Sequence, residues 1–135
     1  MSYPSLLLFG VPIRRALVAK KQLGRHFRSV TKIVLRWYTE LEDGNIQSST
    51  GPVYDSRFLD YRLDVELVLK KFTPNEVNAL LYVHRDGLTH AQAIRLSGIP
   101  SERPDRTVAD IEIRVGQAFE RRRLSEFTQY IGYLR

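Results

Sequence analysis

Two side chains near the C-terminus are of the types that recognise nucleic-acid bases. Arg114 and Gln117 are three residues apart, so both would lie on one side of a helix. Arginine can donate two hydrogen bonds to the edge of a guanine, and glutamine can pair in the same way with an adenine. We interpret this pair as candidate base-reading side chains.

The helix that would carry them is predicted from Val108 to about Leu124, with Thr107 as its N-cap. Apolar spacing predicts an inner face of Val108, Ile111, Val115 and either Ala118 or Phe119, with the stem of Arg122. The outer face would then present Thr107, Ala109, Asp110, Ile113, Arg114 and Gln117.

Arginines flank both ends of this predicted helix. Arg103 and Arg106 flank its start, where free backbone amides and the helix dipole also favour phosphate. The trio 121–123 lies at the far end, where contact with phosphate and simple stabilisation of the helix dipole are equally good explanations. The sequence therefore predicts a DNA-binding surface made of Arg103, Arg106, Thr107, Asp110, Arg114, Gln117 and Arg121.

Two shorter helices are predicted to position this surface. Thr73, followed by Pro74 and Glu76, forms a capping-box pattern that predicts a helix to Asp86, ended by Gly87. A second helix would start at Thr89, contain the apolar residues Ala91, Ala93, Ile94 and Leu96, and close at Gly98 and Ile99. Three helices with a glycine-bearing connection and a basic last helix are typical of a helix-turn-helix.

The pieces Phe72-Thr73-Pro74, Gly87-Leu88-Thr89, Ser97-Gly98-Ile99 and Thr107-Val108 resemble region 4 of bacterial sigma factors in composition and order. The resemblance covers residues 64–119, and the spacings from Pro74 to Gly87 and from Gly87 to Gly98 agree with it. Two features depart from the pattern. The turn 100–106 is longer, and the bracing helix has Ala93-Ile94 in reversed order.

A basic helical arm ahead of a solitary unit of this type is similar in layout to phage late-gene regulators of the ArpU, RinA and antiterminator types. The resemblance implies a helix-turn-helix that binds double-stranded DNA and contacts bacterial RNA polymerase. No sigma region 2 accompanies it, so we do not expect promoter melting. The alternative that remains is an ordinary three-helix bundle without DNA contact.

The N-terminal part is predicted to be helical as well. One helix would run from Pro12 to about Gln22, Gly24 would interrupt the chain, and a second would run from Ser29 to Glu42. Residues 43–52 have a loop composition, and 4–9 could be a short strand or an apolar arm. A third helix, 55–71, would bury Phe58, Leu59, Leu63, Leu67 and either Val65 or Val68. We thus predict an all-α protein with a basic arm and linker at 1–52 and a DNA-binding domain at 53–135.

Charge is distributed unevenly in a chain whose net charge is +6. Residues 1–39 contain eight lysines and arginines and no carboxylate, which is typical of a segment that binds a polyanion. A solvated basic helix face is the plainer interpretation. The apolar stripe of this arm, Ile33, Val34, Trp37 and Leu41, must pack either on the helix at 55–71 or in a second subunit, which leaves a homodimer open.

Other classes of protein find little support. Cysteine is absent, and His26, His84 and His90 lie in separate segments without metal-ligand spacing, so we expect surface or helix positions for them. No catalytic motif occurs, and we expect neither an enzyme nor a metal or other cofactor. The run Leu6–Phe9 is too short to span a bilayer and is not a signal peptide, so we expect a cytoplasmic protein without a membrane partner.

The sequence therefore predicts a DNA-binding transcription regulator with a C-terminal helix-turn-helix. The alternative is a protein-interaction module that acts on RNA polymerase or on a sigma factor without specific DNA binding. RNA binding through the basic arm also stays open, although no RNA-binding signature supports it.

Overall fold

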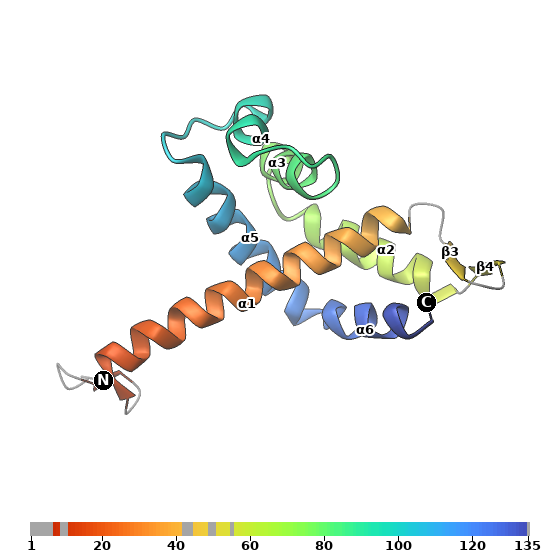
Figure 1. The fold of residues 1–135 in the computed structure, drawn as a ribbon, viewed down its shortest axis with the longest axis horizontal. Helices are drawn as coiled ribbons and strands as arrows, with labels where there is room; N and C mark the ends of the chain where they lie inside the picture. The colour runs from red at the N-terminus through yellow and green to blue at the C-terminus, as the bar shows by residue number, and fades with distance from the viewer. Residues whose placement is uncertain (1–6, 9–10, 42–44, 49–50, 55, 135) are drawn as a thin grey trace.

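A computed structural model describes residues 7–8, 11–41, 45–48, 51–54 and 56–134, with side chains for 19–41 and 56–129. The helices are α1 (Ile13–Glu40), α2 (Ser56–Leu69), α3 (Pro74–His84), α4 (His90–Ser97), α5 (Pro104–Arg121) and α6 (Leu124–Leu134). Two small antiparallel hairpins join β1 (Leu7–Leu8) to β2 (Val11–Pro12) and β3 (Asn45–Ser48) to β4 (Gly51–Tyr54). The fold therefore consists mainly of helices, as predicted (Figure 1).

The first helix is longer than the sequence predicted. α1 continues unbroken through Gly24, which was expected to separate two helices. A Cβ at Gly24 would lie 3.4 Å from Cδ1 of Ile113, so α5 packs closely against α1 at this point. Packing against α5 supports the helix across a residue whose intrinsic helix propensity is low.

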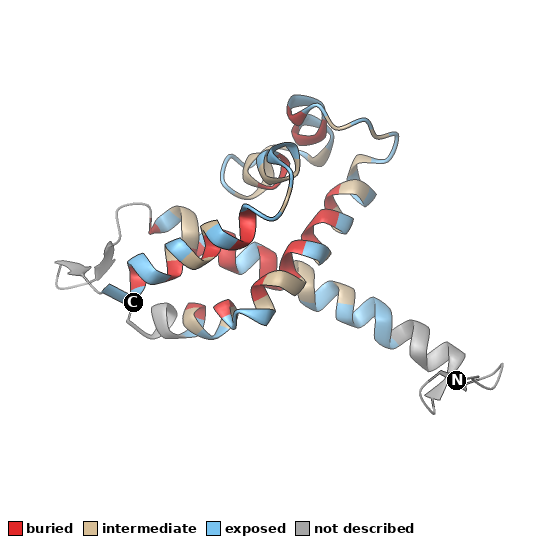
Figure 2. Cartoon of the chain, turned by 180° about the vertical axis from the view of Figure 1, so that it is seen from behind, coloured by how far each residue is buried: buried red, intermediate tan, exposed pale blue. Residues whose placement is uncertain are grey.

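The second half of α1 is the centre of the hydrophobic core. Val34, Leu35 and Leu41 are fully buried, and they belong to one cluster with residues of α2, α3, α5 and α6. Figure 2 shows the buried residues where these helices meet. One core therefore joins helices before and after residue 52, where the boundary between arm and DNA-binding domain was predicted. Of the apolar stripe on the arm, only Ile33 stays largely exposed, so the stripe packs within the chain.

The buried face of α2 differs from the prediction. Phe58, Tyr61, Val65, Val68 and Leu69 are buried, whereas Leu59, Leu63 and Leu67 are 51%, 49% and 47% exposed. The aromatic residues determine the orientation of the helix: the Tyr61 ring stacks on Phe127, and its hydroxyl donates a 2.7 Å hydrogen bond to the carbonyl of Val34. The prediction was wrong for the leucines because both sets of residues have helical spacing.

The segment predicted as a loop at 43–52 contains part of a hairpin. In it Ile46 pairs with Val53 and Gln47 with Pro52. At the N-terminus Leu7–Leu8 pairs with Val11–Pro12, so the two described residues of the possible strand at 4–9 are extended; the rest lies outside the described residues. No described helix has the length and apolar character needed to cross a membrane.

The C-terminal helix was not predicted as a separate element. α5 ends at Arg121, and Arg123 takes a left-handed backbone conformation with φ 55° before α6 begins. Leu124 is buried, and α6 returns along α1 and α2. Because of this bend, α6 folds back and buries one of its sides in the core.

Candidate nucleic-acid interface

The two short helices begin where the sequence predicted. Oγ1 of Thr73 accepts a hydrogen bond from the amide of Glu76, and the Glu76 carboxylate accepts one from the amide of Thr73. Thr89 and Gln92 form the same reciprocal pair at the start of α4. The predicted capping box at Thr73 is confirmed, and the predicted cap at Thr89 is part of a second capping box; the two fix the starting points of the helices that support α5.

The ends of these helices also follow local signals. α3 ends at His84, two residues before the predicted Asp86, and Gly87 follows with φ +70°. Gly98 ends α4 with φ +75°, a conformation that side chains with a Cβ rarely adopt. Ala79 of α3, Ile94 of α4 and Val108 of α5 then meet in a small buried cluster. The three helices form one packed unit.

The start of α5 corrects the prediction that Thr107 is its N-cap. α5 begins at Pro104, and the amide of Thr107 already donates a hydrogen bond of 3.0 Å to the carbonyl of Arg103. Proline suits the first helical position because its φ is fixed and it has no amide hydrogen to satisfy. The Thr107 hydroxyl instead hydrogen-bonds that of Ser101, which fastens the α4–α5 connection to the helix.

The inner face of α5 is the predicted one with two additions and without the stem of Arg122, which is exposed. Val108, Ile111, Val115 and Phe119 are buried, and Phe119 rather than Ala118 completes the stripe. Glu112 and Gly116 are buried as well, which the sequence analysis missed. Arg122 follows the last helical residue and hydrogen-bonds Asp64.

Six of the seven predicted DNA-binding residues lie on one side of α5, and the seventh, Arg103, is its N-cap. A helix turns by about 100° per residue, and this places the six residues within an arc of about 100°, away from the buried face. Arg103, Arg106, Asp110, Arg114 and Arg121 are exposed, while Thr107 and Gln117 are half-buried. We call this side of α5, together with Arg103 and the half-buried Ile113, the outer face. It carries four arginines and one carboxylate.

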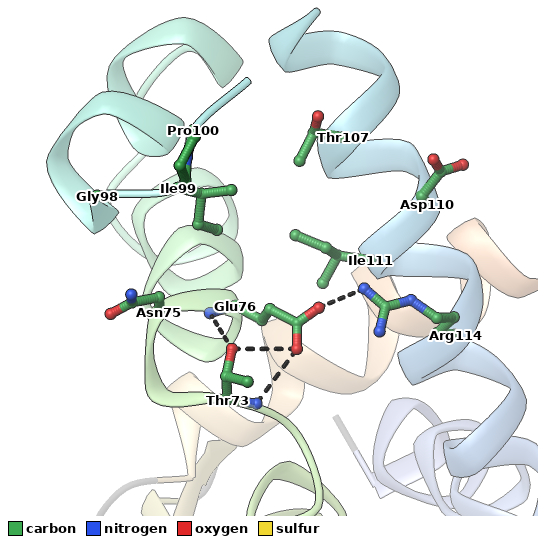
Figure 3. A pocket seen from close by; sticks show the side chains of 10 residues that line it. All are labelled: Thr73, Asn75, Glu76, Gly98, Ile99, Pro100, Thr107, Asp110, Ile111 and Arg114. Carbon is green, nitrogen blue, oxygen red and sulfur yellow. Dashed lines mark hydrogen bonds and ion pairs between the residues drawn. The ribbon is translucent and has the colours of Figure 1, made fainter. Parts of the chain in front are cut away.

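One of these arginines is engaged elsewhere in the structure. The guanidinium of Arg114 donates a hydrogen bond to the carboxylate of Glu76 in α3 (Figure 3). Partial burial alone would raise the pKa of Glu76, but the bonds from Arg114 and Thr73 outweigh it and hold that pKa below its usual value. Arg103, Arg106 and Arg121 form no ion pair with any described residue.

A pocket of about 400 Å³ lies beside this ion pair, between the start of α3, the α4–α5 connection and α5. Thr107 and Ile111 line it from α5, and Gly98, Ile99 and Pro100 line it from the connection (Figure 3). Arg114 and Glu76 link α3 to α5 at its edge. The pocket thus lies on the α3 side of the outer face.

α1 covers the opposite side of α5 at very short range. A Cβ added to Gly116 would lie 2.1 Å from the carbonyl oxygen of Phe27 and 2.9 Å from Oγ1 of Thr31. Thr31 donates a 2.6 Å hydrogen bond to the carbonyl of Glu112. The two helices therefore touch backbone to backbone, and only glycine fits at residue 116.

A buried carboxylate ties three helices together behind the outer face. The side chain of Glu112 is 5% exposed; it accepts a 3.1 Å hydrogen bond from Nε of Arg28 in α1 and lies 2.8 Å from Nε2 of His84 in α3. The His84 side chain is 10% exposed, so it is not the surface residue that was one of our two expectations. Glu112 falls within the predicted inner face, and a buried charge needs partners. That was the signal available in the sequence.

We expect Glu112→Gln to lower the free energy of unfolding by about 1–2 kcal/mol at neutral pH. Burial alone would raise the pKa of Glu112, but the bonds and charges of His84 and Arg28 outweigh it, so the folded-state pKa is lowered. A lowered carboxyl pKa adds stability above the unfolded-state pKa, and this is lost as the pH falls through the folded-state value. Urea unfolding from pH 7 to pH 3 should therefore show a smaller acid-induced loss in the variant; equal losses would contradict the prediction.

Each of the other two histidines lies beside one acid. His90 lies 2.7 Å from Asp105, and His26 lies 3.9 Å from Glu120. Among the residues that the structure describes, no group of three or more histidine, cysteine or acidic side chains could hold a metal ion.

Comparison of the chain with protein-family models, with curated proteins and with solved structures found no match.

Proposed function

We propose that this chain is a DNA-binding transcription regulator of the phage or prophage type, and that α5 is the helix that enters the major groove. The observation that carries the proposal is the outer face of α5. Three of its arginines are free of ion pairs with described residues, and Gln117 lies between them along the helix. The short α4 and the capped α3 hold the helix from behind, as in a helix-turn-helix.

The residue types on the outer face suit two kinds of contact. Arg103 and Arg106 at the start of α5 anchor phosphates, with help from the helix dipole. Gln117 and Arg114 read base edges in the groove. Arg121 is in the last turn of α5, where stabilisation of the negative end of the dipole is an alternative role.

The phosphate anchors provide a direct test. The double variant Arg103→Gln, Arg106→Gln should weaken binding to all duplex sequences alike and flatten the plot of log affinity against log salt by about two units, because each phosphate contact adds about 0.9. Fluorescence anisotropy of a labelled duplex, titrated at several salt concentrations, measures this slope.

A matched control is Lys70→Gln, Lys71→Gln, which removes the same charge from exposed residues just after α2. It should leave the slope close to that of the wild type. A loss of affinity confined to certain sequences would show instead that Arg103 and Arg106 read bases. A wild-type chain that binds duplex DNA without salt dependence would contradict the proposal.

A second candidate function is a protein-interaction module that acts on RNA polymerase or on a sigma factor without specific DNA binding. The row of exposed leucines on α2, Leu59, Leu63 and Leu67, favours it, because adjacent exposed leucines form an apolar patch suited to a protein partner. Purified RNA polymerase holoenzyme should then be retained by the immobilised wild-type chain and not by Leu63→Asp. Retention together with an absence of selective DNA binding would establish this function over the first.

A further inference from the structure

The first half of α1 projects from the body of the molecule. α1 crosses α5 where Gly116 meets Phe27 and Gly24 lies against Ile113, and the residues before Gly24 extend away from the other helices (Figure 1). Lys20, Lys21 and Arg25 lie on this half and are exposed. From Ile13 to Arg25 the helix is about 18 Å long at 1.5 Å per residue, which matches about five base pairs along a DNA strand.

This projecting half borders the outer face of α5. Gly24 of α1 lies against Ile113, which shares that face with Gln117 one turn further on. Lys20 and Lys21 are four and three residues before Gly24, respectively, so they lie on the same side of α1 as the glycine. The first halves of α1 and α5 diverge from their crossing, and α3 and α4 lie on the other side of α5 (Figures 1 and 2). A duplex placed on the outer face would thus lie beside these lysines.

The ion pairs of α1 lie where the helix packs on the body, although Lys32 in that part forms none with a described residue. Arg28 pairs with Glu112, Arg36 with Glu40, and His26 lies near Glu120. Lys20, Lys21 and Arg25 form no ion pair with any described residue, and residues 1–39 contain no carboxylate. Lys20, Lys21 and Arg25 can therefore bind an anionic partner outside the chain without breaking an ion pair with a described residue.

We propose that the first half of α1 is a second DNA-binding element, which holds the phosphate backbone beside the groove that α5 occupies. This inference rests on the proposed function and adds where the first half of α1 lies in the complex with DNA. Lys20 and Lys21 contact phosphates and carry no sequence information, because phosphates are alike at every base pair. Sequence is read by α5 alone.

The test compares Lys20→Gln, Lys21→Gln with the control Lys70→Gln, Lys71→Gln on a duplex that the wild type selects from a random library. The arm variant should flatten the salt slope by about two units, with the larger loss of affinity at low salt, while the control keeps the wild-type slope. The preferred sequence should be the same for all three proteins. Hydroxyl-radical footprinting should show one patch of backbone protection lost in the arm variant and retained in the control.

Two results would overturn the inference while the proposed function stands. One is selective duplex binding in which the arm variant keeps the slope and footprint of the control. The other is a changed preferred sequence in the arm variant, which would make the arm a base reader. A wild type that selects no duplex, or that prefers RNA to duplex DNA, would instead overturn the proposed function together with this inference.

Thermal unfolding of both variants should match the wild type, because all four lysines are exposed.

Discussion

Gly116→Ala is expected to lower the free energy of unfolding by about 2–3 kcal/mol, at the upper end of the cost of overpacking a tight interface. The added Cβ would meet the carbonyl oxygen of Phe27 at 2.1 Å, and a backbone atom cannot turn aside as a side chain can. α1 must then shift away from α5, which loosens the hydrogen bond from Thr31 to Glu112. Alanine's better helix propensity, about 1 kcal/mol, offsets only part of this.

The matched control for Gly116→Ala is Gly24→Ala, the same substitution at the same pair of helices. There the added Cβ would lie 3.4 Å from the flexible end of Ile113, which is close to an ordinary contact. We expect the control to be neutral or to stabilise the protein by up to about 1 kcal/mol. Urea unfolding of the two variants measures the difference. Equal stabilities would show that α1 and α5 do not approach as closely as described.

The second large effect is expected at the base-reading side chains. Arg114→Ala and Gln117→Ala should each cost about 1–3 kcal/mol of binding free energy on the selected duplex and relax the preference at one base pair. Arg114 must leave Glu76 to reach a base, and an exposed ion pair of this kind adds only about 0–1 kcal/mol, so the exchange is feasible. Binding titrations with single-base variants of the duplex measure both changes.

Arg114→Lys separates the charge of this residue from its geometry. Lysine keeps the positive charge and can still pair with Glu76, but it lacks the planar fork that donates two hydrogen bonds to guanine. Affinity for random duplex should be close to that of the wild type, while the base preference is lost. A lysine variant with an unchanged preference would show that Arg114 acts only as a charge.

Local signals in the sequence were sufficient for the helix starts near the site. The capping boxes at Thr73 and Thr89 depend on residues three positions apart, so no distant contact is needed to predict them. At α5 two local signals competed, and Pro104 rather than Thr107 began the helix. The longer connection expected from the sequence is in part the first turn of α5.

Features that depend on distant contacts could not be predicted in the same way. α1 passes through Gly24 as one helix because α5 packs against it, which no neighbouring residue indicates. On α2 the leucines and the aromatic set have equally good helical spacing, and contacts of Tyr61 with Val34 and Phe127 decide between them. Periodicity places Glu112 within the inner face, but its partners Arg28 and His84, and the contact of Gly116 with Phe27, come from segments distant in the sequence that periodicity does not indicate.

The most direct test of the central claim is selection from a random duplex library by the full chain, and by the variant Arg114→Ala, Gln117→Ala. The account predicts that the wild type enriches one sequence and binds it at least about a thousandfold more tightly than random duplex. The double variant should still bind DNA through its phosphate contacts but lose that sequence. No enrichment by the wild type, or the same enriched sequence for both proteins, would contradict the claim that the outer face of α5 reads DNA.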